Sequence, residues 1–242
     1  MATLKKKIKR FIYNILPYYI AEEFYSLKNQ YFNNISFSQE GEDLVLNRFF
    51  ERQKTGFYVD IGAHHPMRFS NTYKFYLKGW RGINVDAMPG SMDVFNKIRP
   101  NDINLEIAVS NKQQILTYYI FNEPALNTFS EEIAQEHSEI NSYYRITDKI
   151  KIKTESLVNI LDLHLPSNIN IDFMSIDVEG LDLSVLQSNN WDKYRPKMLL
   201  VEALYSELDS LTTNEVYLYL KRLNYKLVAK TYNTMFFKDG NE

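Results

Sequence analysis

Short apolar runs rich in β-branched and aromatic residues recur along the chain, bounded by glycine or polar residues, and this pattern favours buried strands over helices. They predict strands at 57–61, 82–86, 103–109, 171–177 and 197–202, with two further strands at 225–229 and 234–237. Apolar residues at helical spacing predict helices at 44–50, 71–78, 89–98, 155–164, 181–187 and 213–223. Because strands and helices alternate, we expect an α/β domain with a parallel sheet, right-handed crossovers and an antiparallel hairpin at one edge.

The stretch from 110 to 149 departs from this alternation. Residues 114–121 form another β-like run, residues 122–149 are polar and irregular, and residues 150–154 alternate as an edge strand does. We interpret 110–149 as an insertion over the sheet edge, on the side where an acceptor substrate binds. A plain surface loop is the alternative.

Residues 1–35 form an N-terminal arm before the domain at 36–242. Basic residues and apolar residues at helical spacing alternate over 1–24, which predicts a basic amphipathic helix. Such a helix can lie on an anionic membrane surface, or it can pack on the body of the protein or on the second subunit of a homodimer. The chain has no apolar run long enough to span a bilayer and no signal-peptide cleavage pattern.

Composition narrows the class of function. The chain has 242 residues, of which 45% are hydrophobic and 24% charged, as in a soluble globular protein. Its 28 Lys and Arg residues against 30 Asp and Glu residues leave a net charge of −2, so no overall basic charge points to nucleic acid. The absence of cysteine excludes disulfides, thiolate catalysis and cysteine-based zinc sites, and it fits a cytoplasmic location.

Candidate chemistry begins at the turn after the first strand, Asp60-Ile61-Gly62-Ala63-His64-His65-Pro66. A strand, a glycine turn and a helix, with an acid near the end of the strand, form a nucleotide-type crevice in an open α/β sheet. A dinucleotide site needs the pattern Gly-x-Gly-x-x-Gly, and this turn has a single glycine. The alternative of an NAD(P)-dependent oxidoreductase then depends on Tyr217 and Lys221, a Tyr-x-x-x-Lys pair on a leucine-rich helix.

Four predicted parallel strands end in an acidic residue: Asp60, Asp86, Asp177 and Glu202. The carboxyl ends of such strands share one edge of the sheet, where ligands bind. Asp86 lies 24 positions after Gly62, a spacing that loosely fits the acid that binds ribose hydroxyls in nucleoside-binding folds. Four acids at one edge repel one another unless cationic groups or a metal ion offset their charge.

Several segments between about Ser36 and Glu202 resemble the FkbM family of S-adenosylmethionine-dependent methyltransferases. They are Ser38–Asp43, Tyr58–Pro66 with Ser70–Thr72, Gly79–Asp86 and Ile171–Gly180. The resemblance implies the class I methyltransferase fold, a Rossmann-like and mostly parallel seven-stranded sheet with helices on both faces. The predicted terminal hairpin fits the antiparallel last strand of that fold.

The resemblance also implies a site for S-adenosylmethionine. Residues of the glycine turn would face its methionine part or orient that turn: Asp60, Gly62 and Ala63. Asp86 would bind the ribose hydroxyls, and the turn after the third strand, with Glu106 and Ala108, would flank the adenine. Asp177 would line the methyl-transfer site.

The transfer itself requires an aligned acceptor oxygen and the removal of its proton. His64 and His65 are two of four histidines in the chain, and we assign His65, together with Asp177, to catalysis. Metal-dependent class I O-methyltransferases place metal ligands after strands four and five, where this chain has Asp177 and Glu202. We therefore expect these two carboxylates, with His65 as a further candidate, to hold Mg²⁺ or another hard divalent ion.

The sequence thus predicts an S-adenosylmethionine-dependent O-methyltransferase that modifies a hydroxyl of a sugar, a nucleotide-sugar, a glycan or a secondary metabolite. We expect a small-molecule or glycan acceptor and no nucleic acid. The oxidoreductase and a non-catalytic partner subunit that keeps the fold are the alternatives.

Overall fold

The computed structural model describes residues 34–140, 142–203 and 208–241. The chain divides into two compact units, Met1–Ile35 and Ser36–Glu242. The predicted amphipathic helix at 1–24 lies outside the described residues, so it stays a prediction.

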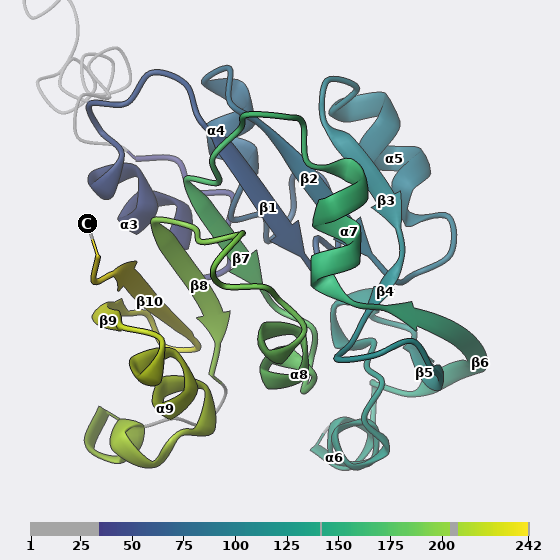
Figure 1. Ribbon diagram of the computed structural model, residues 1–242. Coiled ribbons are helices and arrows are strands. Elements are labelled where there is room, and N and C mark those ends of the chain that lie inside the picture. Colours follow the sequence, from purple (N-terminus) through teal and green to yellow (C-terminus); the bar gives the residue numbers. More distant parts are fainter. Residues whose placement is uncertain (1–33, 141, 204–207, 242) are drawn as a thin grey trace, which may run out of the picture. The chain divides into compact units, whose positions relative to one another are not determined.

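The second unit is built on a seven-stranded sheet with the order β3-β2-β1-β7-β8-β10-β9 (Figure 1). The strands, in chain order, are β1 (Phe57–Ile61), β2 (Arg81–Asp86), β3 (Ile103–Glu106), β7 (Phe173–Ile176), β8 (Met198–Glu202), β9 (Tyr225–Lys230) and β10 (Thr234–Asp239). The first five are parallel, and β10 is antiparallel to both β8 and β9. The predicted fold class and the terminal hairpin are confirmed.

Helices cover both faces of this sheet (Figure 1). One face carries α3 (Glu42–Phe49), α4 (Tyr73–Leu77) and α5 (Ser91–Ile98), and the other carries α7 (Leu157–His164), α8 (Asp182–Gln187) and α9 (Glu215–Arg222), with the short 3₁₀ helix η2 (Leu208–Thr213) before α9. Alternation along β1 directs Val59 and Ile61 into the core under α7–α9, and it directs Tyr58 into the aromatic core under α3 and α4. β1 is buried at all five positions, as expected for an interior parallel strand.

The prediction of one strand over 103–109 is wrong. β3 ends its pairing with β2 at Glu106, and the next two residues form β4 (Ala108–Val109), which pairs with β6 (Ile146–Glu155) in a second sheet. The order of this three-stranded sheet is β4-β6-β5, with β5 at Ile115–Phe121. β6 is therefore the middle strand of a small sheet, whereas the alternation at 150–154 suggested an edge strand.

The region 122–149 is more ordered than its polar sequence indicates. It contains the 3₁₀ helix η1 (Pro124–Leu126) and the helix α6 (Glu131–Ile140) before β6 begins. Within α6 only Ala134 is fully buried, so an apolar stripe of the usual width is missing and periodicity does not reveal the helix.

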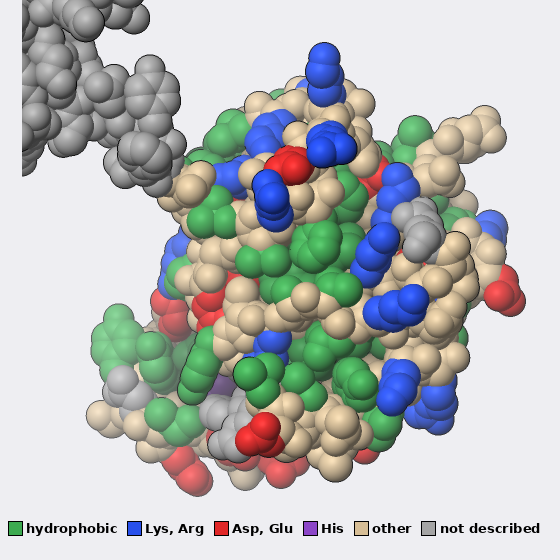
Figure 2. Space-filling model, turned by 90° about the vertical axis from the view of Figure 1, so that its left-hand side faces the viewer, with side chains coloured by type: hydrophobic (Ala, Val, Ile, Leu, Met, Phe, Trp, Pro, Cys, Tyr) green, Lys and Arg blue, Asp and Glu red, His purple; other side chains and the backbone are tan. Residues whose placement is uncertain are grey.

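The sheet ends at β9, on the side that Figure 2 shows, where apolar side chains are interspersed with lysines and arginines. Lys226 on β9 is exposed, and lysines on an outer strand oppose the addition of a further strand. Over the described ranges, no helix combines the length and the apolar character needed to cross a membrane.

Candidate active site

A pocket opens at the carboxyl ends of β1, β2 and β7, where the strand order of the sheet reverses. Its empty space, including the part continuous with solvent, is about 890 Å³. Its apolar wall includes Ile61, Val85, Ile107, Val109 and Phe129. Its charged lining is acidic, and no lysine or arginine of the described residues lines it: the acids are Asp86, Asp177 and Glu179.

Only glycine fits at position 62, beside this pocket. Its φ is +82°, and a Cβ at this position would lie 1.7 Å from the carbonyl oxygen of Asp177. The N–H groups of Gly62 and Ala63 both donate to the carbonyl of Val85, at 2.9 and 3.0 Å. Gly62 lines the pocket, whereas Ala63 is buried against Met92 and Phe95 and does not.

Asp86, at the end of β2, ties two turns together. One carboxylate oxygen accepts the N–H of His64 and the other accepts the N–H of Met88, each at 2.8 Å. Burial raises the pKa of Asp86, and these backbone bonds oppose that shift. Each oxygen keeps a second lone pair, so the side chain can still accept bonds from a ligand in the pocket that it lines.

Of the two neighbouring histidines, His64 lines the pocket and His65 does not. Nδ1 of His65 accepts the N–H groups of Met67 and Arg68, at 3.1 and 3.0 Å, so His65 stabilises its own turn. Burial, together with the charge of Arg68, lowers the pKa of His64 to about 4, so His64 is neutral near pH 7. The predicted catalytic role of His65 therefore has no support from its position.

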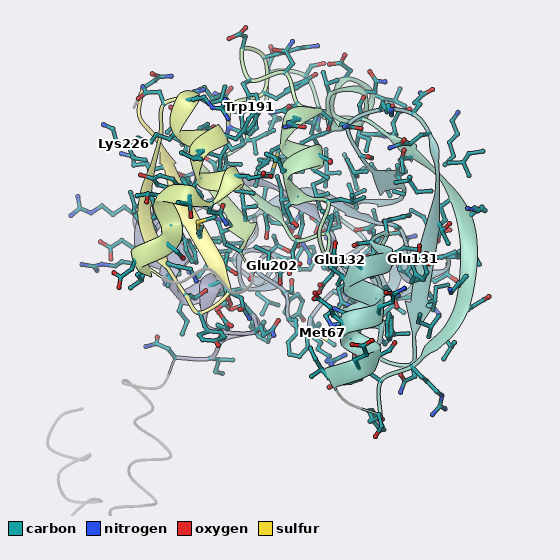
Figure 3. The ribbon with its side chains drawn as sticks, turned by 90° about the horizontal axis from the view of Figure 1, so that it is seen from below. Met67, Glu131, Glu132, Trp191, Glu202 and Lys226 are labelled. Carbon is teal, nitrogen blue, oxygen red and sulfur yellow. The ribbon has the colours of Figure 1, made fainter. Side chains whose placement is uncertain are left out.

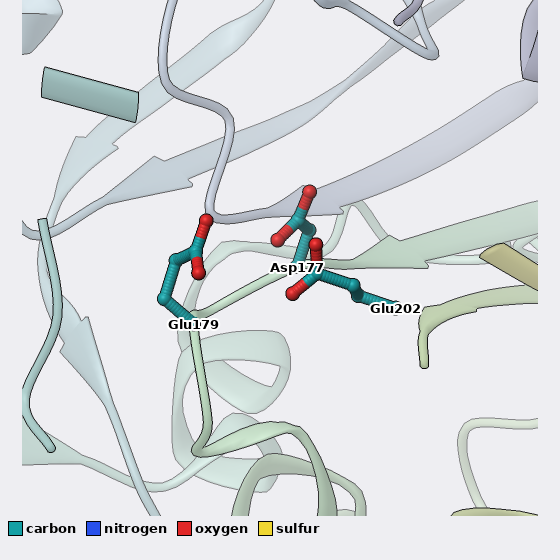
Figure 4. Close-up of side chains that lie close together, drawn as sticks. All are labelled: Asp177, Glu179 and Glu202. Carbon is teal, nitrogen blue, oxygen red and sulfur yellow. The ribbon is translucent and has the colours of Figure 1, made fainter. Parts of the chain in front are cut away.

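Three carboxylates gather at the ends of β7 and β8. Asp177, Glu179 and Glu202 each offer an oxygen, and these oxygens all lie within 4.8 Å of one another. Figure 4 shows the three side chains close together, and Figure 3 shows Glu202 near the centre of the view from below, with Glu132 and Glu131 of α6 to its right. The predicted pair Asp177 and Glu202 is thus brought together, Glu179 joins it, and His65 is not in the group.

This proximity changes the acidity of the group. Burial raises the pKa of Asp177, and the charges of Glu179 and Asp182 add to the effect. Burial and the Asp177 carboxylate raise the pKa of Glu202, whose side chain is hydrogen-bonded to Asp177. Without a cation, the arrangement favours a protonated Glu202 that donates to an ionised Asp177.

The insertion fixes the turn that carries Glu179. Thr128 donates its hydroxyl to the carbonyl of Glu179 at 2.7 Å, and Ile133 of α6 occupies the space where Gly180 would carry a Cβ. Glu179 has a φ of +48°, an uncommon conformation for a residue with a side chain. Nε2 of His137, also on α6, lies 3.8 Å from a carboxylate oxygen of Glu179.

Asp60 belongs to a different environment. Its carboxylate accepts the hydroxyl of Thr72 at 2.7 Å, and Thr72 in turn accepts a bond from the fully buried Arg99 at 3.0 Å. Asp60 does not line the pocket. Burial raises its pKa, while Thr72 and Arg99 act in the opposite direction.

The two residues predicted beside the adenine also lie off the pocket. Glu106 accepts the N–H of Gly90 at 2.6 Å, just before α5, and Ala108 is buried in β4. Their neighbours Ile107 and Val109 line the pocket instead. Side chains alternate along extended backbone, so a shift of one residue exchanges the inner and outer sets.

Several other lining residues lie in segments that the sequence singled out, 110–149 and Ser38–Asp43, but no role was assigned to them individually. Tyr118, Pro124, Ala125, Asn127 and Phe129 come from the insertion, and Gln39 comes from the loop before α3. Tyr118 lies in the β-like run at 114–121, and its two adjacent tyrosines were the one sequence feature that could have indicated a binding role for this run. Tyr217 and Lys221, the pair behind the oxidoreductase alternative, lie on α9 and do not line the pocket.

Left-handed backbone concentrates at the pocket. Of the five non-glycine residues with positive φ in the described chain, three line it: His64, Phe69 and Glu179. Such conformations cost free energy and cluster at sites where function constrains the backbone. This concentration makes the pocket the candidate active site of the domain.

The family comparison agrees with this geometry. The model of the methyltransferase FkbM domain matches residues 60–227, well over half of the chain, and the match includes the strands that form the pocket. No curated protein shows a significant match. The chain belongs to the FkbM methyltransferase family, as the resemblance of its motifs predicted.

Proposed function

We propose that this methyltransferase uses S-adenosylmethionine to methylate a hydroxyl group of a sugar, a nucleotide-sugar, a glycan or a secondary metabolite. The observation that carries the proposal is the charge of the pocket: its ionised lining side chains are acidic, and within the described chain no lysine or arginine lines it. Such a pocket suits a ligand with a sulfonium and an ammonium group, and it disfavours the pyrophosphate of a dinucleotide.

Different residues of the pocket would bind different parts of this cofactor. Asp86 has free lone pairs for the ribose hydroxyls, and Val85, Ile107 and Val109 offer an apolar wall for the adenine. Asp177 and Glu179 place negative charge at the other end, for the amino and sulfonium groups. When bound, the cofactor supplies a methyl group on a positively charged sulfur.

We assign the removal of the acceptor's proton to Asp177. Its carboxylate lines the pocket, and its raised pKa makes it a stronger base than an ordinary carboxylate. Glu202 acts in the opposite direction, because the hydrogen bond between the two side chains lowers the pKa of Asp177 and keeps its carboxylate ionised, in the form that can accept the proton. His64 is the histidine that shares the pocket; its Nε2 lies 3.5 Å from the donor Nη1 of Arg68, so as a neutral ring it can offer its Nδ1–H to the acceptor oxygen.

The acidic group also fits a hard divalent cation. Asp177, Glu179 and Glu202 offer three carboxylate oxygens within 4.8 Å of one another, and Mg²⁺ or Mn²⁺ prefers such ligands. These residues would hold the ion, which would lower the pKa of an acceptor hydroxyl bound beside it. The mutual repulsion that raises the pKa of Asp177 and Glu202 would then be relieved.

Transfer of a labelled methyl group to a panel of nucleotide-sugars, oligosaccharides and simple alcohols tests the proposal, with Mg²⁺ and with EDTA in parallel. We expect label in at least one hydroxyl acceptor with the wild type and none with Asp177→Asn. Loss of activity in EDTA would establish the metal. A wild type that binds S-adenosylmethionine but labels no acceptor would favour the non-catalytic partner subunit.

The oxidoreductase alternative has no feature of the pocket in its favour. A nicotinamide-cofactor titration followed by fluorescence decides it directly. Saturable binding of NADH or NADPH, without binding of S-adenosylmethionine, would overturn the proposed function.

A further inference from the structure

Tyr118 on β5 is a buried side chain with a polar tip at the pocket. It is 6% exposed, it lines the pocket, and its ring centroid lies 4.5 Å from that of Phe129. The ring is therefore held by packing, and only its hydroxyl can change partners. A buried tyrosine usually satisfies that hydroxyl with a hydrogen bond.

The side chain of Asn127 sets the direction of that hydroxyl. Its Oδ1 accepts the N–H of Phe121 at 2.8 Å, which fixes the amide so that Nδ2 is the group directed elsewhere. Nδ2 donates to the sulfur of Met88 at 3.6 Å, and the same amide group acts on the Tyr118 hydroxyl, where it opposes the rise that burial gives to the pKa of Tyr118. Because Asn127 donates, the oxygen of Tyr118 acts as acceptor in this contact.

The proton of Tyr118 is consequently available for another acceptor. Within the part of the chain that the structure describes, no acceptor is recorded for it. Asp86 lines the same pocket and is near enough for its charge to raise the pKa of Tyr118, although burial is the larger cause. The two oxygens of Asp86 already receive the N–H groups of His64 and Met88.

The pocket therefore holds both a hydrogen-bond donor, Tyr118, and a pure acceptor, Asp86. A ribose hydroxyl both donates and accepts, so a carboxylate satisfies its proton and leaves its oxygen without a donor. An unpartnered hydroxyl oxygen in a pocket costs free energy, and a preset donor removes that cost.

We propose that Tyr118 donates a hydrogen bond to a ribose hydroxyl oxygen of S-adenosylmethionine, and that Asn127 is the positioning residue that turns the Tyr118 hydroxyl toward it. The inference rests on the proposed function, because it concerns the same cofactor. It gives the insertion a role in cofactor selection, in addition to the acceptor-side role expected from the sequence.

The test is a calorimetric titration with S-adenosylhomocysteine and with its 2′-deoxy and 3′-deoxy analogues. We expect Tyr118→Phe, which keeps the ring and removes the hydroxyl, to weaken S-adenosylhomocysteine binding about tenfold. For the analogue that lacks the oxygen bound by Tyr118, the same substitution should change the affinity less than about twofold. Equal losses for all three ligands, or no loss for S-adenosylhomocysteine, would overturn the inference.

A second variant tests the positioning role. Asn127→Asp keeps the acceptor for the N–H of Phe121 but turns the donor toward Tyr118 into an acceptor, so the hydroxyl would point away from the ribose. We expect weaker binding with Asn127→Asp alone and a clearly smaller effect of the same change when Tyr118 is already phenylalanine. Additive effects would show that Asn127 does not act through Tyr118.

The outcomes separate the inference from the proposed function. If the wild type binds none of the three ligands, the proposed function fails and the inference falls with it. If the wild type binds S-adenosylhomocysteine and Tyr118→Phe binds it equally well, only the inference fails.

Discussion

Two groups of acidic residues lie at the same sheet, and they differ in their counter-charges. Between the sheet and the α4–α5 layer, Asp102 pairs with the fully buried Arg99 at 2.9 Å, and Arg99 reaches Asp60 through Thr72. At the strand ends, Asp177, Glu179 and Glu202 lie together, and after burial it is neighbouring carboxylates that most raise the pKa of Asp177 and Glu202. One group carries its own counter-charge, and the other offers its charge to a ligand.

The sequence pattern gives Asp60 and Asp177 the same appearance, since each is an acid at the end of a buried run followed by glycine. What separates them is a residue distant in the sequence. Arg99 is 39 positions beyond Asp60 and completes that network, whereas the pocket that Asp177 lines has no lysine or arginine among its described lining residues. We therefore interpret Asp60, which is linked to a buried arginine, as structural, and Asp177, which lies in a pocket lined by acids, as a ligand-binding residue.

The largest expected effect comes from removing that cation. Arg99→Met keeps most of the side-chain volume but leaves Asp102 buried without its partner, so we expect a loss of about 3–5 kcal/mol of unfolding free energy. Urea denaturation measures it. Arg48→Met, which breaks an exposed ion pair with Glu51, is the matched control and should cost less than about 1 kcal/mol. Similar small losses for both variants would contradict the structural role of Arg99.

The acidic group at the pocket should respond in the opposite direction. Asp177→Asn removes a buried negative charge that Glu179 and Asp182 repel, so we expect the unfolding free energy in EDTA to rise by about 1 kcal/mol while methyl transfer is lost. The same urea experiment measures the stability. A destabilisation comparable to that of Arg99→Met would mean that Asp177 also belongs to a structural network.

His64 allows a smaller test of the pocket's electrostatics. Its pKa in the folded state is about 4, below the ordinary value of 6.5, so the unfolded state takes up the proton first as the pH falls. Stability is therefore lost as the pH falls from 6.5 toward 4, by about 1 kcal/mol between pH 6.5 and pH 5 once solvent screening is allowed for. His64→Gln should lack this part of the pH dependence. Identical slopes for the two proteins would show that His64 is not buried as neutral imidazole.

The sequence predicted the parallel sheet because its local signals agree with the fold. The run at 57–61 is apolar, β-branched and aromatic, and every residue in it is buried. The run at 103–109 led to the prediction of one strand because both of its halves are strands. The N–H of Ile107 still donates to the carbonyl of Asp86 in β2, and the chain enters the second sheet at the next residue. The helix α6 escaped detection because it packs through few apolar side chains.

The acidic residues of the candidate site could be predicted from the sequence, but most of the other residues that line the pocket could not. Asp86, Asp177 and Glu202 are found at strand ends, as the α/β pattern requires. His64, rather than His65, lines the pocket because a left-handed backbone at His64 redirects the turn, and no sequence signal specifies that φ. Tyr118 and Asn127 belong to the segment 110–149. Its position at the pocket depends on long-range contacts, such as the hydrogen bond from Thr128 to Glu179, which local sequence patterns do not predict.

The most direct test of the account compares S-adenosylmethionine binding by Asp86→Asn and Asp60→Asn. Both substitutions remove one carboxylate at the end of a strand, but only Asp86 lines the pocket. We predict that calorimetry will show a loss of about 100-fold in affinity for Asp86→Asn and a change of less than about threefold for folded Asp60→Asn. Equal effects of the two substitutions, or unchanged binding by Asp86→Asn, would contradict the division between a self-neutralised network and a ligand-binding pocket.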